Sequence, residues 1–363
     1  MSYPQEMRSN RVKSPSSGKP GELALLARIR ARTARTPGST LRLGIGDDCA
    51  LLQLRPGEQL AVTTDLSIAG RHFRLDWHTP ETIGHRTLAR GLSDLAAMGA
   101  RPVAAFLSLG LPSNLVQSSK RRDPSRETWS ETWIARFLDG FLSLAEAHQT
   151  PLAGGDLAES PIPVADIVLT GVVRRGKALL RSGARPGDLL YVTGSLGGAA
   201  AGLAQLEHLA KAARRSRSAR SQAPRIPASL KAQLAPRLFP QPRIAQGLWL
   251  ARRSLATAAI DLSDGLSTDL AHVCEESGVA AEVNAAALPI HPGATEAQAI
   301  HGGEDYELLF TASPSVRMPR SIAGVSVTCI GRVVRKSGTR APVTLITARG
   351  LLPLAPQGWE HFS

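Results

Sequence analysis

Acidic residues lie in several apolar, glycine-flanked segments of this chain. A buried carboxylate needs a proton, a cationic partner or a metal ion, because moving an unpaired charge out of water is costly. Few basic residues stand beside these segments, so metal ions are the simplest partners. The five segments are Gly46-Asp47-Asp48, Thr63-Thr64-Asp65, Ser93-Asp94, Gly154-Gly155-Asp156 and Asp261-Leu262-Ser263-Asp264.

The potential ligands in these segments are all oxygen atoms. Hydroxyls of Thr63, Thr64 and Ser263 accompany the carboxylates, and oxygen ligands suit Mg²⁺ better than zinc. Because Mg²⁺ keeps part of its water shell and bridges to phosphate groups, the pattern predicts a nucleotide site. A single Asp of this kind is more simply a turn or capping residue. The prediction therefore rests on the five segments together.

The sequence excludes two common routes to phosphate chemistry. It has no GxxxxGK[ST] loop, which excludes a P-loop enzyme, and no His-Arg-Asp or Asp-Phe-Gly set, which excludes a protein-kinase fold. Without a lysine loop around the phosphates, several Mg²⁺ ions would have to neutralise the transferring group. No covalent nucleophile stands out either. Cys49 follows the Asp-Asp pair, but it is more simply a small buried hydrophobe.

Helix and strand patterns place these acids in two α+β units of similar size, with a boundary near residue 175. In the first, a helix is predicted from Thr79-Pro80-Glu81, which supplies an N-cap, a proline at the first position and an acid in the first turn, to Gly99. A second, amphipathic helix is predicted at 127–148. Strands are predicted at 41–54, 59–68, 103–111, 163–173, 256–262, 279–283, 306–312, 325–334 and 343–348.

Composition narrows the class of protein further. The 363 residues are 43% hydrophobic, which is typical of a globular chain, and no run of about 18 apolar residues predicts a membrane span. Residues 1–20 are polar and basic without an apolar stretch, which predicts a disordered tail and no secretory signal. The three cysteines are an odd set without CxxC spacing, which argues against a disulfide framework or zinc knuckle. A cytoplasmic protein is predicted.

The net charge of +13 raises the question of a nucleic-acid partner. Much of the excess lies in Lys211–Lys231, which holds seven basic residues and no acid. Two prolines interrupt this stretch and it has no aromatic residue for base stacking. We interpret it as a solvated linker or insertion and do not expect nucleic-acid binding. The alternative predicts steeply salt-dependent binding to DNA or RNA that is lost when 211–231 is deleted.

Read in order, the motifs resemble those of the thiamine-monophosphate kinase family. The resemblance runs from about residue 21 to the last residue. It is carried by GIGDDCALL (44–52), TTDLSIAGRHF (63–73), LSDLAAMGA (92–100), GGD (154–156), RSGARPGD (181–188), IDLSDGLSTDL (260–270), GGEDYELLF (302–310) and GWEHF (358–362). The acid segments are shared with aminoimidazole ribonucleotide synthetase, selenophosphate synthetase and a hydrogenase-maturation protein. The last two motifs discriminate best.

The resemblance implies a two-domain fold, with N-terminal domain 21–175 and C-terminal domain 176–363, in which the N-terminal sheets of two subunits form a barrel-like dimer core. It implies direct transfer of the ATP γ-phosphoryl group to thiamine monophosphate, without a catalytic side chain of its own. Mg²⁺ would be held by Asp48, Thr63, Thr64, Asp65, Asp94, Asp156, Asp261 and Asp264, ATP by Gly155, Asp156, Arg181 and Ser263, and thiamine monophosphate by His72, Glu304 and Trp359.

The chain departs from the family pattern at three places. Leu157 stands where a threonine usually follows Gly-Gly-Asp, residues 120–126 and 211–231 resemble insertions, and residues 1–20 have no counterpart. Another ATP-dependent enzyme of the same superfamily stays an alternative. A selenophosphate synthetase would need a reactive cysteine or selenocysteine in an N-terminal glycine-rich loop, and none precedes Cys49.

Overall fold

The computed structural model describes residues 22–33, 40–45, 47–116, 132–215, 226–338 and 341–358. The predicted tail 1–20, the insertion 120–126 and Trp359 lie outside the described residues, as does 216–225 of the basic stretch. Within the described part, no helix is both long and apolar enough to cross a membrane.

The N-terminal half builds a four-stranded sheet in the order β3-β6-β4-β5, in which only the β4–β5 pair is parallel. Its buried face packs against α2 and α4, and leucine side chains of both helices, with phenylalanines of α4, fill the core between them. The elements are α1 (Glu22–Thr33), β1 (Leu41–Leu43), β2 (Leu51–Leu52), β3 (Glu58–Ile68), α2 (Pro80–Ala97), β4 (Arg101–Leu111), α3 (Ser113–Val116), α4 (Trp133–Ala147), β5 (Leu152–Glu159) and β6 (Val164–Arg174).

The C-terminal half builds an eight-stranded mixed sheet in the order β14-β13-β9-β12-β7-β10-β8, with β11 paired to β12. The elements are β7 (Leu189–Thr193), α5 (Gly198–Arg215), η2 (Ala228–Leu230), α6 (Lys231–Leu238), α7 (Ile244–Arg253), β8 (Ala258–Asp261), α8 (Leu266–Ser277), β9 (Val279–Asn284), η3 (Ala285–Ala287), α9 (Glu296–His301), β10 (Leu308–Ala312), β11 (Ser321–Ile322), β12 (Val325–Arg335), β13 (Val343–Thr347) and β14 (Gly350–Pro353).

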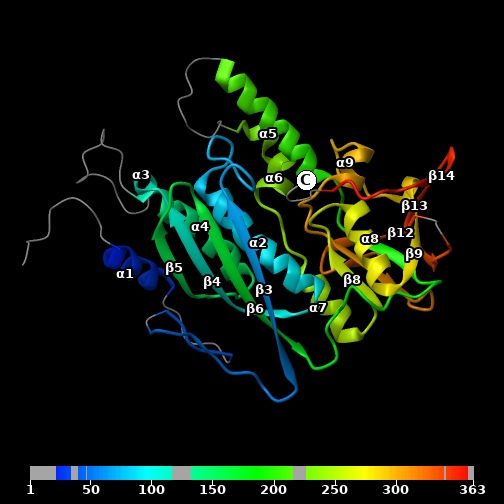
Figure 1. Cartoon of the computed structure of the whole chain (residues 1–363), viewed down its shortest axis with the longest axis horizontal. Coiled ribbons are helices and arrows are strands. Elements are labelled where there is room, and N and C mark those ends of the chain that lie inside the picture. The colour runs from blue at the N-terminus through cyan, green and yellow to red at the C-terminus, as the bar shows by residue number, and fades with distance from the viewer. Residues whose placement is uncertain are drawn as a thin grey trace, which may run out of the picture.

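Two sheets with their own helices agree with the predicted two-domain α+β architecture (Figure 1). Neither described sheet closes into a barrel within one chain. The domain limits at residues 175 and 176 stay a prediction. The predicted single strand over 41–54 is wrong: β1 and β2 are short antiparallel strands, and the segment with the Asp47-Asp48 pair is the loop between them.

Helix α2 joins the two halves, since it packs against β3 and β6 on one side and against α7 and β8 on the other. It begins as predicted at Pro80, where the Thr79 hydroxyl accepts from the backbone N–H of Thr82. An added Cβ at Gly247 of α7 would lie 1.9 Å from the carbonyl oxygen of Ala96. The two helices therefore pack backbone against backbone, which holds the halves in a fixed relation.

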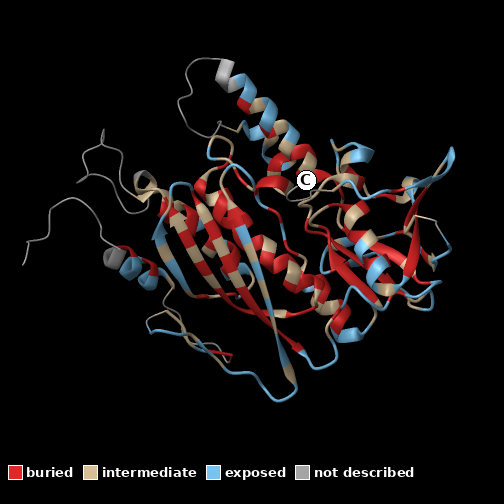
Figure 2. Cartoon of the chain, viewed as in Figure 1, coloured by how far each residue is buried: buried red, intermediate tan, exposed pale blue. Residues whose placement is uncertain are grey.

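Strand β3 has two unlike faces because its side chains alternate. The face toward α2 carries Thr63 and Asp65. The other face carries Leu60, Val62 and Leu66, whose exposed fractions are 44%, 56% and 46%. Figure 2 shows exposed and half-buried residues alternating along β3 at the edge of the N-terminal sheet. An apolar edge strand of this kind is normally covered by another surface.

Candidate active site

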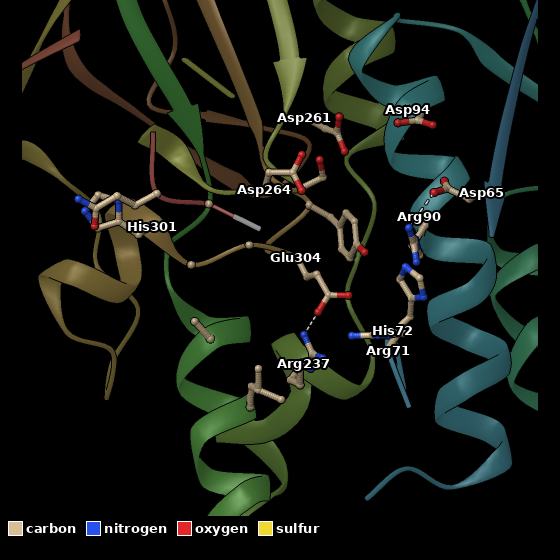
Figure 3. Close-up of a pocket in the computed structure, with 18 residues that line it drawn as sticks. Asp65, Arg71, His72, Arg90, Asp94, Arg237, Asp261, Asp264, His301 and Glu304 are labelled. Atoms are coloured by element: carbon tan, nitrogen blue, oxygen red, sulfur yellow. Dashed lines mark hydrogen bonds and ion pairs between the residues drawn. The ribbon is translucent and has the colours of Figure 1, made fainter. Parts of the chain in front are cut away.

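A cavity of about 590 Å³ opens where α2 meets the C-terminal half. Its walls come from β3 and the loop after it, from α2, α5 and α6, from the β8–α8 loop and from the loop before β10. Figure 3 shows four aspartates on one side of this cavity, with Arg90 beside Asp65, and Arg71, His72 and Arg237 around Glu304 on the other. The residues of the acidic side are Asp65, Asp94, Asp261 and Asp264.

Asp94 lies on α2 and faces two other carboxylates. The hydroxyl of Thr63 on β3 donates to its Oδ2 atom. Burial, followed by the charges of Asp261 and Asp65, raises the pKa of Asp94 to about 7, against the smaller lowering effect of the Thr63 hydrogen bond. The ionised form of Asp94 is therefore costly in the metal-free protein, and it would be stabilised by a cation placed among the three carboxylates.

Asp261 ends β8 and reaches the same cavity from the other domain. The Ser93 hydroxyl of α2 donates to its Oδ2 atom over 2.7 Å. Burial raises the pKa of Asp261 to about 6, against the lowering effect of this hydrogen bond. Arg181 is exposed, yet its charge lowers the pKa values of Asp94 and Asp261, so it lies close enough to act on both. Serine and aspartate thus link the two halves at the site.

Asp65 pairs with Arg90 of α2, whose Nη2 atom lies 3.0 Å from Oδ1. Burial still raises the pKa of Asp65, because desolvation outweighs the charge and hydrogen bond of Arg90. Arg90 is the basic residue that Figure 3 draws bonded to this acidic side. Arg90, even together with the charge of Arg181, is outnumbered by the four carboxylates of the acidic side.

The β8–α8 loop that carries Ser263 and Asp264 is held by a backbone conformation that only glycine adopts readily. Gly265 has φ of 107°, and an added Cβ would lie 2.8 Å from the carbonyl of His301. Asp269 accepts from the backbone N–H groups of Asp264 and Gly265, at 3.1 and 3.0 Å. These contacts direct Ser263 and Asp264 into the cavity.

The acidic side fits hard, oxygen-binding cations. Its donors are carboxylates and hydroxyls, and its buried carboxylates repel one another. Among the described residues, no three acidic, histidine or cysteine side chains form a metal cluster by themselves. An ion here would therefore share its coordination with water and phosphate oxygens, as Mg²⁺ does in nucleotide sites.

Two predicted metal ligands line a different cavity. Asp48, in the β1–β2 loop, and Asp156, on β5, line a second cavity of about 370 Å³, together with Gly154 and Gly155 and apolar side chains that include Phe106. Gly155 has φ of 146°, and an added Cβ would lie 1.8 Å from the carbonyl oxygen of Leu107. Of the eight predicted ligands, four line the first cavity and these two line the second, while Thr63 and Thr64 line neither. The roles of Asp48 and Asp156 stay a prediction.

The structure also shows where three other residues discussed from the sequence lie, namely Thr64, Leu157 and Cys49. The side chain of Thr64 is exposed, because it points to the face of β3 opposite Thr63 and Asp65. Leu157 lines the second cavity, where it offers no hydroxyl. Cys49 is exposed at the second cavity, so its interpretation as a buried hydrophobe is wrong.

The basic side of the first cavity holds the predicted acceptor residues. His72 and Glu304 both line it. Nδ1 of His72 accepts from the backbone N–H of Ile68 over 3.1 Å, which places the ring proton on Nε2. Trp359 lies outside the described residues, but Gln357 and Gly358 line the cavity. The chain therefore enters the site directly before Trp359.

Four residues in or at the edge of the cavity were not predicted from the sequence: Arg86, Arg90, Arg237 and Tyr306. Arg86, Arg90 and Asp94 are four residues apart in a predicted helix, so their common face was a usable signal. Arg237 gave no such signal, because it follows a basic stretch and contacts Glu304 only through the tertiary fold.

Comparisons with known proteins identify the family of this chain. Residues 46–173 match the model of the AIR synthase related protein, N-terminal domain, and 185–319 match that of the C-terminal domain. Thiamine-monophosphate kinase of Escherichia coli K12 is 38% identical over 327 residues, which cover 86% of this chain and 90% of that protein.

Among solved structures, thiamine-monophosphate kinase of Stenotrophomonas maltophilia K279a superposes with a TM-score of 0.71 and 38% identity, covering 90% of this chain and 96% of that one. AaThiL complexed with AMPPCP and TMP gives a TM-score of 0.67 and 27% identity, with 94% and 97% covered. The chain belongs to the thiamine-monophosphate kinase family of the AIR synthase related proteins.

Proposed function

We propose that this chain transfers the γ-phosphoryl group of ATP to the phosphate of thiamine monophosphate, giving thiamine diphosphate and ADP. The observation that carries the proposal is the division of one cavity into an acidic side, with four carboxylates, and a basic side, where Arg71, His72 and Arg237 surround Glu304. Metal-bound phosphates suit the first and an anionic acceptor suits the second. The family relatives, one of them complexed with AMPPCP and TMP, support the same reaction.

Mg²⁺ is the cation we propose for the acidic side, held by Asp65, Asp94, Asp261 and Asp264 with the Thr63 hydroxyl. When bound, Mg²⁺ offsets the charge of the phosphate oxygens during transfer. Asp48, Asp156 and Thr64 are proposed as further ligands, from the family resemblance. For Thr64 the backbone carbonyl is the better donor, because its side chain lies on the other face of β3.

ATP is proposed to contact Gly155, Asp156, Arg181 and Ser263. The exposed Arg181 acts electrostatically on Asp94 and Asp261, which places a guanidinium near the proposed phosphate position. Gly155 brings backbone without a side chain to the second cavity, whose apolar lining suits a nucleotide base.

On the acceptor side, Nε2–H of His72 can donate to the phosphate of thiamine monophosphate. Trp359 is proposed to cover the cationic thiazolium ring. The acceptor phosphate is already ionised near neutral pH, so the chain needs to orient two phosphates and does not need a strong base or a nucleophile. The proposed reaction is therefore a single in-line transfer.

We also propose a homodimer with a barrel-like core of two N-terminal sheets. The exposed Leu60, Val62 and Leu66 on edge strand β3 support it, since a second copy would cover them. We propose a cytoplasmic location, which the three free cysteines support.

Purified protein incubated with ATP, Mg²⁺ and thiamine monophosphate is expected to form thiamine diphosphate and ADP in equal amounts. Chromatography of both products measures this. Unphosphorylated thiamine should give no product, because it lacks the acceptor phosphate, and omission of Mg²⁺ should stop the reaction. Turnover of a different superfamily acceptor, with none of thiamine monophosphate, would overturn the proposal.

A further inference from the structure

Both carboxylate oxygens of Glu304 are bound by buried arginines. Nη2 of Arg86, on α2, donates to Oε1 over 2.7 Å, and Nη1 of Arg237, on α6, pairs with Oε2. The arginine side chains are 5% and 8% exposed, whereas that of Glu304 is 23% exposed. Figure 3 shows the carboxylate of Glu304 directed at Arg237, at the edge of the cavity. Glu304 therefore faces the cavity with its orientation fixed from behind.

The two arginines more than offset the charge of Glu304. Burial lowers the pKa of Arg86 to about 10, which keeps it protonated at neutral pH. The pKa of Arg237 is lowered by burial and by the charge of Arg86, and its Nε atom has no partner among the described residues. The buried His78 nearby has its pKa lowered by burial and by both arginines, so it stays neutral. Glu304 thus stands in a locally positive environment.

Arg86 also fixes the other proposed acceptor residue. It donates to the backbone carbonyls of His72 and Arg237, at 3.3 and 2.5 Å. Glu304 itself has φ of 65°, a conformation that a residue with a side chain keeps only when its surroundings hold it. His72 and Glu304 come from different halves of the chain, and the side chain of Arg86 contacts the backbone of the first and the carboxylate of the second.

A charge that is already neutralised gives a substrate cation little additional attraction, yet its outward lone pairs still accept hydrogen bonds. Thiamine monophosphate offers both kinds of group: a thiazolium cation and an uncharged amino group on its pyrimidine ring. The environment of Glu304 favours the second group.

We propose that Arg86 and Arg237 are positioning residues of the acceptor site, which hold Glu304 as a hydrogen-bond acceptor for the amino group of the pyrimidine ring. The proposal rests on the proposed function and extends it to substrate specificity. It assigns the thiazolium charge to another part of the site.

A double-mutant cycle of Arg237→Met and Glu304→Gln tests the positioning role. Arg237→Met is expected to raise the KM for thiamine monophosphate about 10- to 100-fold, as loss of a charged hydrogen bond does, with the KM for ATP changed less than about twofold. Arg237→Lys should restore part of the loss. In the Glu304→Gln background, Arg237→Met should add little, because its effect acts through Glu304. Additive effects, or equal changes in both KM values, would overturn the proposal.

Arg243→Met is the matched control. Arg243 forms a comparable partly buried ion pair with Glu307, but neither residue lines the cavity. Its replacement should lower the melting temperature without changing the KM for thiamine monophosphate. A similar KM shift in this control would show that any lost ion pair disturbs the site and would overturn a specific role for Arg237.

Oxythiamine monophosphate separates the two roles of Glu304, because it keeps the thiazolium ring but has an oxo group in place of the amino group. The wild type should show a KM at least about tenfold higher for this analogue. Glu304→Gln should reduce that preference. Equal KM values in the wild type would overturn the proposal, while turnover of neither compound would overturn the proposed function itself.

Discussion

Asp94→Asn is expected to reduce kcat at least about 100-fold while the protein stays folded. The substitution keeps the shape of the side chain and can still accept from the Thr63 hydroxyl, but it removes one negative charge from the acidic side. Loss of a group that merely orients a metal ligand already costs about 10- to 100-fold, so loss of a ligand should cost more. Initial rates of thiamine diphosphate formation at saturating ATP and Mg²⁺ measure the effect.

Asp139→Asn is the control for this experiment. Asp139 is a half-exposed aspartate on α4 that pairs with Arg32, and it lines neither cavity. The activity of the Asp139→Asn variant should equal that of the wild type. Near-normal turnover of Asp94→Asn at ordinary Mg²⁺ concentration would contradict the assignment of Asp94 as a metal ligand.

The same Asp94→Asn variant is expected to be more stable than the wild type when no metal is present. The pKa of Asp94 rises from 3.8 to about 7 on folding, mainly through burial and then through Asp261 and Asp65. Because the pKa of Asp94 is higher in the folded than in the unfolded protein, protonated Asp94 stabilises the fold. This contribution is fully present below about pH 4 and is lost as the pH rises to about 7. At pH 8 the gain on removing the charge should be about 2–4 kcal/mol.

Denaturant unfolding in the presence of a chelator measures this difference. The wild type should lose stability between about pH 4 and pH 7 more steeply than Asp94→Asn, and Asp139→Asn should follow the wild type. Addition of Mg²⁺ and ADP should stabilise the wild type more than the variant. A metal-free Asp94→Asn protein that is less stable than the wild type at pH 8 would show that the carboxylates do not repel one another as described.

The acids of the first cavity could be predicted from the sequence because each lies in a compact motif at the end or on the face of a predictable element. Asp94 follows from the helical period of α2, and Asp261 and Asp264 follow the apolar strand β8. Alternation along β3 would also have separated Thr64 from Thr63 and Asp65. The positions of these acids could therefore be predicted mainly from the local periodicity of the helix and strands.

The other features of the site could not be predicted, because they depend on contacts between segments that are distant in the sequence. Arg86 and Glu304 are 218 residues apart, and no local pattern pairs them. The loop between β1 and β2 is a second example. Its sequence continues an apolar run, but the described strands stop at Leu43 and resume at Leu51, and the aspartates turn toward the second cavity. Only the packed structure shows that the predicted aspartate ligands line two separate cavities.

The central claim is that the γ-phosphoryl group passes directly from ATP to the acceptor phosphate within the aspartate-lined cavity. The stereochemical course tests it most directly, using ATP made chiral at a thio-substituted γ-phosphorus and analysis of the thiophosphoryl product. A single in-line transfer predicts inversion at phosphorus, in line with a site that orients two phosphates. Net retention would require a covalent phosphoryl-enzyme and would contradict the account.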